Sequence, residues 1–257
     1  MNWGLVILGC TVTAGATSLG ALPAVFMRHL SERTNNILMG FSAGIMLAAS
    51  SFSLIIPAID LMKSQTPFRW VGASFVGLML LLGGLFLFLC DRWIPHEHFI
   101  SGREGGFSST HLKRIWLFVL AIALHNFPEG LAVGSGVGSQ NLTLALPIVF
   151  GIGLQDLPEG FVVAAALMSV GYTRRSSVYV AVVTGIVEAI AAFFGFVATS
   201  FFNPLLPWML AFAGGAMLYV VIEEMIPEIQ GKKIAADATA GILCGFVLMM
   251  VLDVALG

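Results

Sequence analysis

Residues 71–90 read VGASFVGLMLLLGGLFLFLC, twenty consecutive residues without a charged side chain or a proline. An α-helix rises about 1.5 Å per residue, so about twenty apolar residues are enough to cross the hydrocarbon core of a bilayer. Asp91 and Arg92 end the apolar stretch. The run near 71–91 therefore predicts a membrane-spanning helix. The sequence on either side shows whether the chain has further spans.

Seven further apolar runs flank this one, separated by proline, glycine, asparagine and clusters of charge. The connecting segments are short, except residues 92–114, which are polar and contain Gly, Ser and His. We predict an all-α fold, a single polytopic membrane bundle of eight transmembrane helices over residues 1–257. The seven further runs lie near 4–26, 36–60, 115–137, 144–169, 177–198, 205–226 and 235–256.

The composition excludes whole classes of protein. Hydrophobic residues make up 58% of the chain and charged residues 10%, whereas about 25% of a soluble domain is charged. A soluble chain of this length has no way to hide that much apolar surface from water. With 12 Lys+Arg against 14 Asp+Glu, there is also no basic field for nucleic acid. The expected surroundings are a lipid bilayer, as a multi-pass protein of the cell (inner) membrane.

The distribution of lysine and arginine predicts the orientation. When the eight runs are numbered along the chain, so that 71–91 is the third, the loops after even-numbered runs contain only Lys63 and Arg69. The loops after odd-numbered runs contain ten such residues, which predicts that these loops, including 92–114, are cytoplasmic and that both termini lie outside. Within that cytoplasmic loop His96 and His98 are either solvated or weak metal ligands on the transport pathway. The loops after the odd-numbered runs contain Arg28, Arg33, Arg92, Arg103, Lys113, Arg114, Arg174, Arg175, Lys232 and Lys233.

Leaving aside Asp60, Asp91, Asp237 and Asp253, which lie toward the ends of their spans, six acidic residues lie inside the predicted spans. A charge at the bilayer centre costs about 2.5–3.5 kcal/mol on insertion scales and indicates function by default. None of the four spans concerned contains a Lys or Arg that could neutralise them, so a bound cation is the simplest explanation. The six are Glu129, Asp156, Glu159, Glu188, Glu223 and Glu224.

A six-residue pattern occurs twice, as HNFPEG at 125–130 and QDLPEG at 155–160. Residues three and four apart share a helix face, so His125 and Asn126 both neighbour Glu129. Gln155, Asp156 and Glu159 repeat this arrangement in the next span. Proline within each pattern should kink the helix and open room for an ion. Counted from the span ends, both patterns and Glu188 lie about 15 Å deep, near the midplane.

Structural alternatives to metal binding stay open at this point. His125 could be an interhelical hydrogen-bond donor, the paired patterns a packing device, and Glu188 an isolated structural acid. Glu223 and Glu224 lie near the inner end of their span and could be a solvated helix end.

Two further groups are open in the same way. Asp60 and Asp253 lie at outer helix ends, where water can reach them. Met46 lies near the middle of the second span, where methionine is more often a filler of space than a ligand.

The paired patterns resemble those of the ZIP family of divalent-metal transporters, in its prokaryotic branch with Gln-Asp in the second pattern. The resemblance covers the whole chain and implies a binuclear metal centre between the fourth, fifth and sixth spans. One departure is Ser53, at a position in the second span where many relatives have an acid. The implied roles are a first site of His125, Glu129, Gln155 and Glu159, approached by Met46; a second site of Asn126, Asp156 and Glu188, bridged by Glu129 and Glu159; and an inner exit route with Glu223 and Glu224. We also predict that Ser53 and Asp60 lie on the transport pathway.

The ligand chemistry agrees with a borderline metal. One imidazole with carboxylates, amides and no thiolate suits Zn²⁺, Fe²⁺, Mn²⁺ or Cd²⁺ better than Cu⁺. We therefore predict a transporter of divalent transition-metal ions, foremost zinc, with flux toward the cytoplasm implied by the resemblance, and no enzyme: the H-E-x-x-H pattern of a zinc protease does not occur. A proton-coupled transporter of another solute and a membrane metalloenzyme are the alternatives. Whether the chain forms a homodimer is left open.

Overall fold

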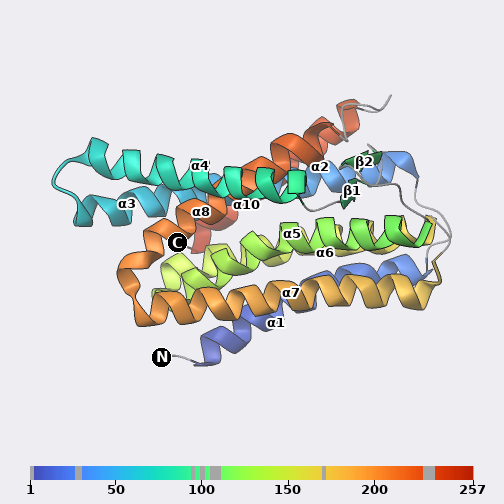
Figure 1. Ribbon diagram of the computed structural model, residues 1–257, viewed down its shortest axis with the longest axis horizontal. Coiled ribbons are helices and arrows are strands. Elements are labelled where there is room, and N and C mark those ends of the chain that lie inside the picture. Colours follow the sequence, from blue (N-terminus) through green and yellow to red (C-terminus); the bar gives the residue numbers. More distant parts are fainter. Residues whose placement is uncertain are drawn as a thin grey trace.

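The computed structural model is built almost entirely of helices (Figure 1). It describes the backbone of residues 3–26, 31–93, 96–98, 102–104, 111–169, 172–227 and 235–256, and within these ranges it leaves undescribed the side chains of residues 3, 32, 35, 64, 91, 96–98, 102–104, 111–122, 125, 166, 169, 224 and 235. The elements are α1 (Trp3–Phe26), α2 (Glu32–Ala48), η1 (Ala49–Ile55), α3 (Ile56–Gln65), α4 (Arg69–Trp93), β1 (His96–His98), β2 (Gly102–Glu104), α5 (His111–Gly138), α6 (Leu142–Ser169), α7 (Arg174–Phe201), η2 (Asn203–Leu205), α8 (Leu206–Val220), η3 (Val221–Met225) and α10 (Ala235–Leu256).

Seven helical stretches among the described residues are long and apolar enough to cross a membrane. Each coincides with a run predicted from the sequence, and α5 covers the remaining predicted run, 115–137. The polytopic helical architecture is therefore confirmed. The seven stretches are Gly4–Phe26, Asn36–Lys63, Arg69–Cys90, Leu142–Ala165, Arg174–Phe201, Asn203–Glu223 and Ala236–Leu256.

The helices divide into two groups (Figure 1). One group contains α1, α5, α6 and α7, and the other contains α2, α3, α4, α8 and α10. Helix α1 begins and α10 ends toward the same end of the bundle. Within each group, glycines let the backbones approach closely, because a side chain there would collide with the neighbouring helix. Gly44 lies against the Ile242 carbonyl between α2 and α10, and Gly83 lies against the Phe212 carbonyl between α4 and α8.

Three features differ from the prediction. The second and seventh spans each contain a π-helical turn, η1 and η3, which the hydropathy of a span does not reveal. The segment predicted as an irregular loop contains β1 and β2, paired antiparallel with His96 opposite Glu104. Helix α5 begins at His111 rather than near 115, because hydropathy marks only the part of a helix that lies in hydrocarbon.

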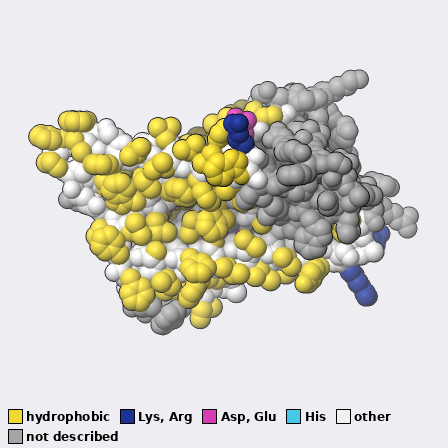
Figure 2. All heavy atoms as spheres, viewed as in Figure 1, with side chains coloured by type: hydrophobic (Ala, Val, Ile, Leu, Met, Phe, Trp, Pro, Cys, Tyr) yellow, Lys and Arg dark blue, Asp and Glu magenta, His cyan; other side chains and the backbone are white. Residues whose placement is uncertain are grey.

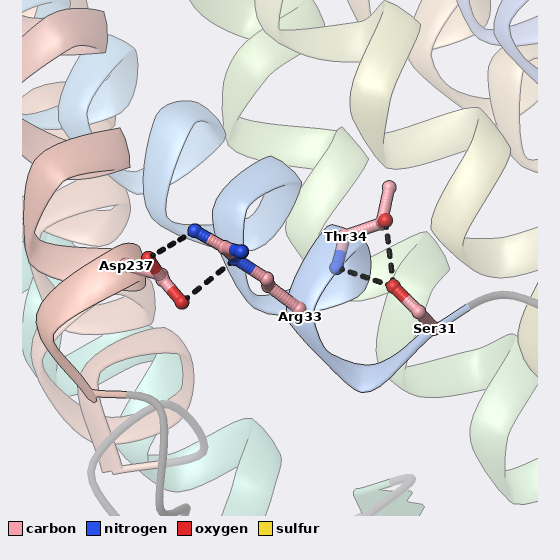
Figure 3. A network of polar contacts seen from close by, with 4 residues as sticks. All are labelled: Ser31, Arg33, Thr34 and Asp237. Carbon is pink, nitrogen blue, oxygen red and sulfur yellow. Dashed lines mark hydrogen bonds and ion pairs between the residues drawn. The ribbon is translucent and has the colours of Figure 1, made fainter.

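Helices α2 and α10 are joined at the end of the bundle that the charge distribution assigns to the cytoplasm (Figure 3). The Ser31 hydroxyl accepts a hydrogen bond from the Thr34 amide at 3.1 Å and caps α2. Two residues after Ser31, the Arg33 guanidinium contacts both carboxylate oxygens of Asp237, at 3.0 and 3.1 Å. The pair is solvent-accessible, so it contributes at most about 1 kcal/mol to stability.

Hydrophobic side chains cover most of the described surface in Figure 2. Leu81 is 73% exposed, and Ile7, Phe194 and Val254 are also exposed. In water such a surface would be an aggregation site, whereas in a bilayer it faces hydrocarbon at no cost. Because the apolar surface is outside, the polar residues that need partners are collected inside, and these define the functional site.

Candidate metal centre

Three carboxylates from two helices converge inside the bundle. Oxygen atoms of Glu129 on α5 and of Asp156 and Glu159 on α6 all lie within 4.8 Å of one another. Glu129 is fully buried, Asp156 is nearly so, and Glu159 is partly accessible. The two repeated patterns therefore face each other across the interface between α5 and α6.

A hydrogen bond connects the two patterns directly. The Gln155 amide nitrogen donates to a carboxylate oxygen of Glu129. An amide that donates from its nitrogen turns its carbonyl oxygen away from this bond. That oxygen is buried and has no hydrogen-bond partner among the described residues. Gln155 therefore has an acceptor oxygen that is available to a cation beside the carboxylates.

Helix α7 contributes Glu188, which is fully buried. Neither of its carboxylate oxygens has a hydrogen-bond partner within the described part of the chain. Asn126 on α5 is also buried, and its side-chain oxygen is unpartnered there in the same way. Buried polar atoms in proteins are almost always paired with protein, water or an ion, so this accumulation of free acceptors is typical of a cation site.

Glycines bring these acidic helices together. A side chain at Gly130 on α5 would collide with the backbone carbonyl of Glu188 and with Ala191, both on α7. A side chain at Gly160 on α6 would collide with the Thr17 carbonyl on α1. The glycine that ends each repeated pattern thus sets a helix contact one residue away from the pattern's glutamate. Both helices continue through the prolines of the patterns, Pro128 and Pro158.

The ion pairs found between described residues lie away from this cluster. Arg33 pairs with Asp237 and Lys63 with Asp60, both at helix ends. Like charges this close repel strongly where the dielectric constant is low. Buried oxygens of Asp156 and Glu188 that have no hydrogen-bond partner within the described part of the chain can therefore be satisfied by a positive ion, and their acceptor-only chemistry suits a divalent metal.

The remaining predicted residues with described side chains belong to other helices. Met46 on α2 is 2% exposed and belongs to the main hydrophobic core. Ser53, in η1, donates a hydrogen bond of 2.6 Å to Asp253 on α10. Asp60 on α3 is exposed and pairs with Lys63. Glu223 is exposed within η3.

Four predicted residues have side chains outside the described part of the structure: His96, His98, His125 and Glu224. His125 lies on α5, one residue before the buried Asn126. Its role as a metal ligand stays a prediction.

Sequence reasoning missed two features. The bond from Ser53 to Asp253 joins residues 200 positions apart, and the sequence has no signal that pairs them. The π-helical turns contain three predicted pathway positions, Ser53, Glu223 and Glu224. π-Helical turns occur often at functional sites. Because they contain these positions, η1 and η3 are candidate functional segments that mutation can test.

Comparisons with known proteins agree with this geometry. A sequence profile of the family described as ZIP Zinc transporter matches residues 101–253. That range includes both repeated patterns and Glu188.

Relatives are similar over nearly the whole chain. The zinc transporter GufA of Myxococcus xanthus is 44% identical over 258 residues, covering 100% of each chain. The zinc transporter ZIPB of Bordetella bronchiseptica is 42% identical, covering 99% of this chain and 82% of that protein. The human zinc transporter ZIP11 is 31% identical, covering 98% and 97% respectively.

Proposed function

Because this chain belongs to the ZIP family of zinc transporters, we propose that it moves Zn²⁺ through two adjacent metal positions between α5, α6 and α7. The chain is a multi-pass membrane protein and a transporter of divalent metal ions. Its relatives are named zinc transporters, which makes zinc the first substrate to test. Iron, manganese and cadmium are the next, since the same donor set accepts them.

In the proposed centre, His125, Glu129, Gln155 and Glu159 hold the first ion. Asn126, Asp156 and Glu188 hold the second, and Glu129 and Glu159 bridge the two. The observation that carries this proposal is the convergence of three carboxylates within 4.8 Å of one another in the bundle interior. Mixed carboxylate, amide and imidazole ligands bind an ion while leaving it able to depart, as a transport site requires.

The proposed topology has eight spans, with α5 as the eighth helix in addition to the seven apolar stretches. Both termini face outward, as the distribution of Lys and Arg indicates. Helix α1 begins and α10 ends toward the same end of the bundle (Figure 1), and this arrangement supports an even number of membrane crossings. The direction of flux in this proposal is toward the cytoplasm.

Uptake into proteoliposomes containing a zinc-sensitive dye tests the proposal. We expect wild-type protein to transport Zn²⁺ and Glu159→Ala to lose transport, because the variant lacks one bridging carboxylate. Asp237→Asn is the matched control, since it also removes an acid but lies at the surface. Normal zinc uptake by well-folded Glu159→Ala protein would refute the proposed centre.

A further inference from the structure

One hydroxyl of α1 behaves unlike its neighbours. In membrane helices, Ser and Thr hydroxyls usually bond to the carbonyl four residues earlier. Thr11 donates to Ile7 in this way, Thr17 to Thr13 at 3.3 Å, and Ser18 to Ala14 at 2.6 Å. The Thr13 side chain is fully buried, and its hydroxyl makes no such bond and has no hydrogen-bond partner in the described part of the chain.

Contacts with α5 fix the depth of Thr13. Gly9 lies against Val133 and Val137, whose methyl groups would be 3.1 and 3.3 Å from a Cβ at position 9. Helices α1 and α5 run antiparallel (Figure 1). Moving one turn along α1 from Gly9 reaches Thr13, and moving one turn back along α5 from Val133 reaches Glu129. Residues four apart share a face, so Thr13 lies level with the turn of α5 that runs from Glu129 to Val133.

Contacts with α6 lead to the same depth. The carbonyl of Thr17 lies against Gly160, and these two helices run parallel (Figure 1). Gly153 on α6 lies against Val12 and Ala16, whose side-chain atoms would be 2.7 and 3.9 Å from a Cβ at position 153. Thr13 follows Val12 and therefore lies between the levels of Gly153 and Asp156, within about one turn of Asp156.

Helix α7 gives the third reference point. The Cys10 thiol donates to the carbonyl of Ala189 at 3.5 Å, and Glu188 is the residue before Ala189. Cys10 and Thr13 are three residues apart and share a face of α1. From contacts with three different helices, Thr13 is placed beside the residues of the second metal position.

The carboxylates of the second metal position need a hydrogen-bond donor that holds them in place, and Thr13 can supply one. Carboxylates that bind a metal are usually held in place by hydrogen bonds from a second layer of residues. Asp156 and Glu188 carry buried oxygens without hydrogen-bond partners among the described residues, and both are acceptors only when ionised. A neutral hydroxyl donor orients such a group without adding charge, and its bond to a carboxylate is of the stronger, charge-assisted kind.

We propose that Thr13 is a positioning residue of the second metal position, donating its hydroxyl proton to the Asp156 or Glu188 carboxylate when a cation is bound there. This inference rests on the proposed function and adds a fourth helix, α1, to the centre. It assigns a role to a residue type that carries no charge and belongs to neither repeated pattern.

The test compares Thr13→Val, which keeps the shape and removes the hydroxyl, with Thr13→Ser, which keeps the hydroxyl. Thr17→Val is the matched control on the same helix, because the Thr17 hydroxyl already bonds to the Thr13 carbonyl. Zinc binding to the full-length protein in detergent is measured by calorimetric titration and by metal content after dialysis. Loss of a second-layer partner costs about 10–100-fold in metal affinity, so Thr13→Val should weaken the second zinc ion by about ten-fold.

We expect the first zinc ion to bind Thr13→Val as it binds wild type, and Thr13→Ser to restore most of the affinity for the second. Equal affinities for both ions in wild type and Thr13→Val would overturn the role of Thr13 and leave the proposed centre intact. An equal loss in Thr17→Val would also overturn it, because the effect would then belong to the packing of α1. Fewer than two zinc ions on wild type would refute the pair of positions itself.

Discussion

Replacing Glu129 by Gln should stabilise the metal-free protein and remove its stabilisation by zinc. The side chain is fully buried and contributes to two of the three carboxylate pairs within 4.8 Å. Two ionised carboxylates 4.8 Å apart repel by about 3.5 kcal/mol at an effective dielectric constant of about 20. Glutamine keeps an oxygen that can accept the hydrogen bond from Gln155, so the change removes charge with little change of shape.

Zinc should stabilise wild type strongly and Glu129→Gln only slightly. A ligand that binds only the folded state adds about 2.7 kcal/mol of stability at a hundred times its Kd. Wild type should gain this stability on addition of Zn²⁺ and lose it with a chelator. Glu129→Gln should begin from a higher melting temperature in chelator and gain little, because a bridging ligand is missing.

Thermal unfolding in detergent, with chelator and with Zn²⁺, measures both effects. Asp237→Asn controls for the loss of an acid: its pair with Arg33 is accessible, so stability should change by less than about 1 kcal/mol and the response to zinc should persist. If Glu129→Gln were less stable than wild type in chelator and still responded fully to zinc, the carboxylates would neither repel one another nor bind the metal.

Three further predictions follow from the same geometry. Gly130→Val should prevent the close approach of α5 to the Glu188 carbonyl, so yield and melting temperature should both fall; normal values for both would contradict the packing described for these helices. Asp156→Asn combined with Glu188→Gln should retain measurable uptake with one bound zinc instead of two, by metal analysis, because the first position keeps its ligands; complete loss of binding would mean that the positions are not separable. Ser53→Ala removes the 2.6 Å bond to Asp253 and should change the apparent affinity for zinc in uptake assays while leaving metal content unchanged, whereas an unchanged affinity would make the bond purely structural.

The sequence by itself determined where the helices lie and how many of them are candidate membrane spans. In a bilayer every backbone polar group must be satisfied within its own segment, so apolar runs become helices whatever their neighbours are. The span 71–91 could therefore be assigned from its own residues, and the structure places Arg69–Cys90 there. The repeated patterns were equally local, since residues three and four apart share a face by helix geometry alone.

Which helices meet was decided only in the tertiary structure. The contact of Gly160 with Thr17 and the bond from Ser53 to Asp253 join residues 143 and 200 positions apart. Such contacts depend on the fit between two surfaces, and neither surface shows its partner in its own sequence.

The same distinction applies within the site. Placing an acid in hydrocarbon costs free energy, so the acids in the spans could be recognised from the sequence as functional candidates. Placing the neutral Thr13 there costs little, so the sequence alone does not single it out. Its position beside Glu129, Asp156 and Glu188 comes from the packing of α1 against three helices. Charge in an apolar run can be read from the sequence, but the partner of a hydroxyl is fixed only when the helices are assembled.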